Sequence, residues 1–356
     1  MRSLTLSILS ILLIAPALVA QQPPAEQQPN FGERIEVQAV LIDTVVTDNH
    51  GNQILGLDRS DFVVTEDGKP QTIDSVDYFT TRKLLNAKEA NAPFNVQQVK
   101  EQRYFVFFFD KPPEAALFNR IAQARSSVQK FIDTQMTAND KVAIVGHDVR
   151  LKIYSDFTSD KAQLRDALKQ VALFGKGVTT PPADPNVPSI VRNIPGHELI
   201  DRTGTVYEAL TALADALKSI HARKDLVLFS AGIIAPDEEV RGGVLLSRSR
   251  YYDPMIYALN GANVTVYAAN LFDRPPEDPA LHQTLSSIAR ETNGQYYRYA
   301  VSFNPALNEV AKQAAGYYLI TYRTKKSGRG FQHVSVSIRN HPELRVTART
   351  GYEYGQ

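Results

Sequence analysis

The chain has 356 residues, of which 43% are hydrophobic and 22% charged, and its formal net charge at pH 7 is +1. This composition is typical of a globular protein with two domains and a large core. A net charge near zero gives no electrostatic reason to expect a nucleic-acid partner. The sequence has no cysteine, which excludes disulfides, thiol nucleophiles, thiolate metal ligands and a lipoprotein anchor.

The first 20 residues, MRSLTLSILSILLIAPALVA, have the pattern of a secretory signal peptide: one early Arg, an apolar stretch and small residues at the end. We expect cleavage after Ala20, with cleavage after Ala17 and an uncleaved anchor as the alternatives. The mature protein is then predicted to be secreted or periplasmic and to have no integral membrane span. Residues 21–31 are rich in Gln and Pro and are predicted to form a disordered linker.

Residues 32–81 are predicted to form a small β unit. Apolar residues alternate from Ile35 onward, and the segment 61–79 has the pattern of two strands around an Asp67-Gly68 hairpin turn. Three or four strands are marginally stable by themselves, so this unit needs more sheet from elsewhere in the chain. The polar residues 82–102 are predicted to connect it to the next region.

From residue 103 the pattern changes to apolar strands that alternate with amphipathic helices, which predicts an α/β domain over 103–314 with a doubly wound, mostly parallel sheet flanked by helices. The expected strands are 103–109, 141–146, 149–154, 225–230, 263–269 and 295–299, and the expected helices are 114–136, 159–173, 205–221, 253–260, 279–293 and 304–314.

Residues 315–356 return to a period of two and contain three expected strands. We predict that these strands complete the N-terminal β unit as one β-sandwich, into which the α/β domain is inserted. Two long segments inside that domain, 174–204 and 231–252, are expected to be irregular loops. Both lie next to carboxyl ends of strands, where open α/β sheets bind ligands.

The strand at 103–109 leads into Asp110 and then a helix. This arrangement resembles the von Willebrand factor A (VWA) domain, whose first strand ends in D-x-S-x-S and whose three loops hold a divalent cation at a metal-ion-dependent adhesion site. Several further segments resemble exported bacterial VWA-domain proteins, of the type abundant in Acidobacteria. These segments are GLDRSDFVVTEDGKPQTI, YSDFTSDKAQLRDAL, RKDLVLFSAGI, LSSIARETNGQYY and the C-terminal strands. The resemblance covers nearly the whole mature chain and implies a VWA-like fold.

The first of the three cation-binding loops departs from the family pattern. Asp110 matches the first ligand, but Pro112 and Glu114 stand where two serines belong, and proline offers no side-chain oxygen. We therefore interpret Asp110 as an acceptor for backbone N–H groups at the start of the following helix, where the helix dipole favours negative charge. Pro112 and Pro113 suit the first turn of that helix, and Lys111 is expected to pair with Asp110 or Glu114.

The other two loops depart as well. Gly204 stands at the threonine position of the second loop, with Thr203 and Thr205 on either side, and Ala231 replaces the aspartate of the third loop. The resemblance therefore implies a degenerate adhesion site.

We predict that the protein is not an enzyme. We expect it to be an envelope protein of adhesion or scaffold type that binds a protein or peptide through the loops around Asp110. It is predicted to do so without a standard bound cation or other cofactor. One alternative is adhesion that depends on Mg²⁺ or Ca²⁺, through a rewired site made of Asp110, Glu114 and Thr203 or Thr205. A second alternative is a hydrolase with residues drawn from His147, Asp148 and the long loops, although no G-x-S-x-G motif is present.

The segment Arg248-Ser249-Arg250-Tyr251-Tyr252 is the candidate for partner contacts, because Arg and Tyr are enriched at protein interfaces. The competing interpretation is a solvated loop whose two tyrosines pack onto the next helix.

Overall fold

The computed structural model describes residues 36–80, 96–98, 102–178, 180–220, 222–234, 239–240, 244–245, 247–273, 280–326 and 328–355. The predicted signal peptide (1–20), the predicted linker (21–31) and most of the predicted connector (82–102) lie outside these residues. Among the described helices, none combines the length and the apolar character that a membrane span requires.

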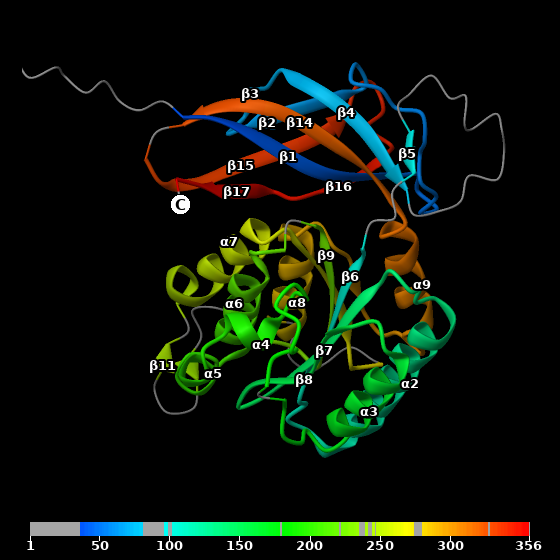
Figure 1. The fold of residues 1–356 in the computed structure, drawn as a ribbon, viewed down its shortest axis with the longest axis vertical. Helices are drawn as coiled ribbons and strands as arrows, with labels where there is room; N and C mark the ends of the chain where they lie inside the picture. The colour runs from blue at the N-terminus through cyan, green and yellow to red at the C-terminus, as the bar shows by residue number, and fades with distance from the viewer. Residues whose placement is uncertain are drawn as a thin grey trace, which may run out of the picture. The chain divides into compact units, whose positions relative to one another are not determined.

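A six-stranded sheet forms the centre of the α/β region, in the order β13-β12-β9-β6-β7-β8 (Figure 1). All neighbouring strands are parallel except β7 and β8, which form an antiparallel hairpin. The strands are β6 (Tyr104–Asp110), β7 (Lys141–Asp148), β8 (Arg150–Thr158), β9 (Lys224–Ser230), β12 (Val264–Asn270) and β13 (Tyr296–Tyr297).

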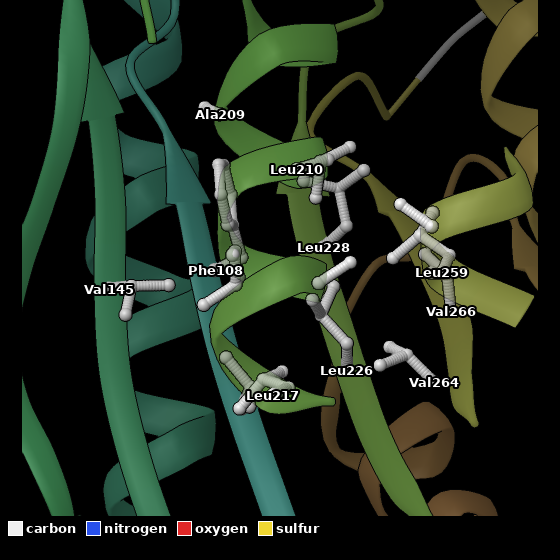
Figure 2. Packing of buried hydrophobic residues seen from close by; sticks show 14 of the residues in the cluster. Phe108, Val145, Ala209, Leu210, Leu217, Leu226, Leu228, Leu259, Val264 and Val266 are labelled. Atoms are coloured by element: carbon white, nitrogen blue, oxygen red, sulfur yellow. The ribbon is translucent and has the colours of Figure 1, made fainter. Parts of the chain in front are cut away.

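Helices cover both faces of this sheet (Figure 1). One face packs against α4 (Ile190–Asn193), α6 (Val206–Leu217), α7 (Asp253–Gly261) and α8 (Ala280–Glu291), and the other against α2 (Phe118–Thr134), α3 (Lys161–Val171) and α9 (Asn304–Gln313). Central strand β6 is therefore buried along its whole length: Phe108 contributes to one core, whereas Phe105, Phe107 and Phe109 contribute to the other. Figure 2 shows Phe108, Leu226 and Leu228 of the sheet beside Leu210 and Leu217 of α6.

Two sheets form the β-sandwich, one in the order β16-β1-β14-β4-β5 and the other in the order β17-β15-β2-β3. Their neighbouring strands are antiparallel, except β4 and β5, which are parallel. Both contain strands from the two ends of the chain, and Phe62 of β2 packs against Tyr318 of β14 with ring centroids 5.2 Å apart. The strands are β1 (Glu36–Thr47), β2 (Phe62–Glu66), β3 (Lys69–Pro70), β4 (Ile73–Thr80), β5 (Val96–Gln98), β14 (Gly316–Lys326), β15 (Gly330–Ile338), β16 (Arg345–Ala348) and β17 (Gly351–Tyr354). The predicted fold class, an α/β sheet with a sandwich from both ends of the chain, is confirmed.

The two long loops contain short elements that the sequence analysis did not predict. The segment 174–204 contains α4 and α5 (Gly196–Asp201). The segment 231–252 contains the strand pair β10 (Glu239–Val240) and β11 (Val244–Leu245), and a π-helix, η2 (Arg248–Tyr252). The helix expected over 114–136 is divided into a 3₁₀ turn, η1 (Ala115–Leu117), and α2.

Candidate functional site

Four neighbouring strands end in buried polar residues at the carboxyl edge of the six-stranded sheet. The strand register places Asp110 of β6 beside His147 of β7, and Ser230 of β9 beside Asn270 of β12. All four side chains are buried. Because a buried polar group is costly unless it is hydrogen-bonded, the partners of these side chains determine what the edge can do.

The carboxylate of Asp110 uses both of its oxygens to join neighbouring strands. Its Oδ2 accepts a hydrogen bond of 2.7 Å from the Ser230 hydroxyl, and its Oδ1 lies 3.4 Å from Nδ1 of His147. The hydroxyl of Ser230 in turn accepts a bond of 3.1 Å from the backbone N–H of Gly232. Asp110 thus connects the first and third loops of the edge.

Our interpretation of Asp110 as a cap of the following helix is wrong. The residue at the N-cap of η1 is Glu114, which makes no side-chain cap bond. Lys111 was expected to pair with Asp110 or Glu114, but its ion-pair partner is Asp148, whose Oδ1 lies 3.0 Å from the Lys111 Nζ. The hydrogen bond from Ser230 and the contact with His147, rather than the helix dipole, account for a carboxylate at the end of this buried strand.

His147 joins the first loop to the second. Its Nε2 lies 3.2 Å from the backbone carbonyl oxygen of Thr203, and its Nδ1 faces Asp110. A carbonyl oxygen can only accept, so Nε2 carries the hydrogen of that bond. The imidazole therefore lies between the carboxylate of Asp110 and the backbone carbonyl of Thr203.

The two threonines of the predicted alternative cation site have structural roles. The Thr203 hydroxyl donates to the Leu199 carbonyl (2.6 Å) and accepts from the Leu151 N–H (3.0 Å). Thr205 is the N-cap of α6 and forms a capping box with Glu208, in which each side chain accepts from the other residue's backbone N–H.

These residues do not fit a Mg²⁺ or Ca²⁺ ion, which needs six or more oxygen ligands in a shared cavity. Asp110 and Thr203 already have their partners, Glu114 is exposed, and Ala231 has no ligand atom. In the described part of the chain, no group of three or more His, Asp or Glu side chains could hold a metal ion. The absence of a standard bound cation remains a prediction that solution experiments must test.

The buried polar residues at the carboxyl edge of the sheet are not arranged as a catalytic triad. A serine nucleophile needs an imidazole as base, with the carboxylate behind it. Here the carboxylate of Asp110 lies between Ser230 and His147, so the serine donates to the carboxylate and does not face the imidazole. The other hydrolase candidate, Asp148, is bonded to two lysines rather than to His147.

Asp148 lies between Lys111 at 3.0 Å and Lys152 at 3.1 Å. Burial alone would raise the pKa of the Asp148 carboxyl, but the bonds from these lysines hold that pKa below its usual value. Asp148 is therefore a stable anion, and the geometry gives no support to a His147–Asp148 acid–base pair.

Tyr251 and Tyr252, which we predicted as partner-binding candidates, point into the protein. Both are buried, and the Tyr252 hydroxyl donates to Oε1 of Glu291 at 2.9 Å. Arg248 lies over the Tyr252 ring at 4.4 Å from its centroid, and Arg250 lies over the Tyr251 ring at 5.3 Å. The competing interpretation, in which the aromatic rings pack against the helices, is therefore the correct one for the two tyrosines. The two arginines remain exposed.

The exposed apolar side chains at the carboxyl edge of the sheet were not predicted from the sequence. Nine large hydrophobic side chains are exposed among the described residues, and six of them lie in segments at the carboxyl edge of the sheet. These six are Val149, Leu173, Val178, Ile200, Ile234 and Val301. No periodic pattern marks them, because each is a single apolar residue in a turn, a loop or a short helix.

No family model and no curated protein matches the chain. Solved structures that resemble it include a von Willebrand factor type A protein from Catenulispora acidiphila, at 8% identity and a TM-score of 0.42, over 92% of this chain and 74% of that one. A mutant of the PilB minor pilin from Streptococcus sanguinis matches at 12% identity and a TM-score of 0.40, over 62% of this chain and 63% of the pilin.

The conserved hypothetical protein BatB from Bacteroides thetaiotaomicron matches at 13% identity and a TM-score of 0.35, over 59% of this chain and 96% of BatB. The match to the pilin spans less than two thirds of its length. Such weak similarities carry no argument about function, so the functional account must come from the residues of this chain.

Proposed function

We propose that this protein binds a protein or peptide noncovalently, as an adhesion or scaffold-type protein of the cell envelope, and catalyses no reaction. The observation that carries the proposal is the concentration of exposed apolar side chains at the carboxyl edge of the six-stranded sheet. Single exposed apolar residues are ordinary, whereas a contiguous exposed patch marks an interaction site, and we propose that these side chains contribute to such a patch.

The side-chain bonds within this edge support binding without a cation. Asp110, Ser230, His147 and Thr203 bond to one another across three loops. A surface held in this way can present a fixed shape to a partner. It would act as a degenerate adhesion site in a protein of the exported, Acidobacteria-type VWA group, secreted or periplasmic after removal of the signal peptide.

A random dodecapeptide display library, selected against the full chain without residues 1–20 in the presence of EDTA, tests this proposal. We expect selected peptides to lose about tenfold in affinity when one of the exposed apolar residues of the edge, such as Ile234 or Val301, is changed to serine. The matched control is Leu55→Ser, which changes an exposed apolar residue outside the α/β region. Failure to select any peptide, or peptides sensitive only to Leu55→Ser, would refute the proposal.

A further inference from the structure

Val149, at the tip of the β7–β8 hairpin, combines a strained backbone with an exposed side chain, and no contact within the described residues accounts for this combination. Its φ is +64°, in the left-handed region that a β-branched residue adopts only at a cost. Its side chain is 73% exposed, so no burial offsets that strain. Gly or Asn would suit the backbone better. Strained residues of this kind occur preferentially at binding sites and active sites.

Side-chain hydrogen bonds connect this hairpin tip to the end of α3. Asp148 is bonded to Lys111 and Lys152, and the Lys152 ammonium also donates to the backbone carbonyl of Phe174 at 2.6 Å. Phe174 has a positive φ of +44°, and the preceding residue, Leu173, is 86% exposed. A second strained backbone position therefore lies beside a second exposed apolar side chain.

The surface around these two apolar residues is positively charged. We call it the hairpin patch, and define it by Val149, Leu173 and four cations: Lys111, Arg150, Lys152 and Lys176. Lys111, Arg150 and Lys176 are exposed, and Lys152 is half-buried.

Asp148 is the carboxylate bonded within the hairpin patch, to two of its lysines. Glu198 and Asp201 lie on α5, which packs against β8, and Glu114 lies on the loop after β6. The four cations of the hairpin patch against its one bonded carboxylate leave an excess of positive charge within the patch, whereas the whole chain has a net charge of only +1. The charge of the hairpin patch is therefore a local feature of this surface.

We infer that the hairpin patch binds an acidic polypeptide segment that carries apolar side chains. This inference rests on the proposed function and specifies the chemistry of the partner. Apolar side chains of the segment would cover Val149 and Leu173, and its carboxylates would pair with Arg150 and Lys176, which have no ion pair among the described residues. Guanidinium groups are suited to two-point contacts with carboxylates.

Three fluorescein-labelled dodecapeptides with identical leucine positions test the charge preference. The remaining positions are Glu in the first peptide, Gln in the second and Lys in the third, and binding is measured by fluorescence anisotropy at low salt. We expect the Glu peptide to bind at least about tenfold more tightly than the Gln peptide, because complementary charge favours the encounter and the complex. The Lys peptide should show no binding. Equal binding of the Glu and Lys peptides, or no binding of the Glu peptide, would overturn the inference.

Val149→Asn tests the site. Asn tolerates the left-handed backbone, so the variant should be at least as stable as the parent, and its affinity for the Glu peptide should fall about tenfold. Leu55→Asn, which changes an exposed apolar residue outside the α/β region, is the matched control and should leave affinity unchanged. Unchanged affinity in Val149→Asn would refute the hairpin patch as the binding site.

The two proposals fail in different ways. Library peptides that bind the carboxyl edge without a preference for Asp and Glu would overturn this inference and leave the proposed function intact. If the library yields no peptide at all, the proposed function itself fails.

Discussion

Replacing Asp110 by alanine should destabilise the α/β region, because the change leaves the buried hydroxyl of Ser230 without its acceptor. The Ser230 hydroxyl loses a bond of 2.7 Å, and Nδ1 of His147 loses a longer contact of 3.4 Å. A hydrogen bond to a charged group contributes about 1.5–3 kcal/mol. The expected loss from the Ser230 bond is therefore about 1.5–3 kcal/mol. In a domain of about 200 residues this lowers the melting temperature by about 3–12 °C.

Urea unfolding followed by far-UV circular dichroism measures this loss, with the slope of the transition as a check that the unfolded state is unchanged. Asp110→Asn is the matched control: its carboxamide oxygen still accepts from Ser230, so it should cost about 1 kcal/mol. A loss below about 0.5 kcal/mol in Asp110→Ala would refute the reasoning, because the carboxylate would then not hold the loops together.

Three further predictions follow from local contacts. Thr205→Ala removes the capping box of α6 and should lower the urea midpoint by an amount that corresponds to about 1 kcal/mol. Burial lowers the pKa of Lys224 to about 7, so between about pH 7 and 10 the unfolded chain binds more protons than the folded one. Stability should therefore rise with pH over that range, and Lys224→Met should lose this rise in melts at a series of pH values. Glu66→Ala leaves the Tyr352 hydroxyl and the Lys326 ammonium without their buried acceptor and should cost about 3–5 kcal/mol in calorimetry; a cost below about 1 kcal/mol would contradict this role.

Local patterns in the sequence were sufficient to predict the architecture. The apolar run 104–109 can only be a strand covered on both faces, and the structure buries every residue of β6. The pair Asp67-Gly68 adopts the positive φ values, +45° and +76°, that the hairpin between β2 and β3 requires. These signals depend on neighbouring residues, which the sequence shows directly.

The site could not be predicted in the same way, because its contacts join residues far apart in the chain. Ser230 and Asp110 are separated by 120 positions, and the Thr203 carbonyl and His147 by 56. The helix α4 was missed for the same reason: its N-terminal N–H groups bond to the carboxylate of Asp156, 34 and 35 positions before Ile190 and Val191.

Burial of the aromatic pair in η2 also depends on distant residues. The Tyr252 hydroxyl finds its partner, Glu291, 39 positions further along the chain. From the sequence, two tyrosines that follow two arginines could belong to an interface or to a core, and only the three-dimensional contact decides between them.

The central claim is that side-chain hydrogen bonds, and not a cation, hold the loops at the carboxyl edge of the sheet. A thermal melt of the chain without residues 1–20 tests it most directly, in EDTA and then with millimolar Mg²⁺, Ca²⁺ or Mn²⁺, beside Asp110→Ala. We predict the same melting temperature in all four conditions for each protein. A cation at about 100 times its Kd would add about 2.7 kcal/mol. A rise in the melting temperature of the parent that Asp110→Ala does not show would contradict the claim and establish a cation site at Asp110.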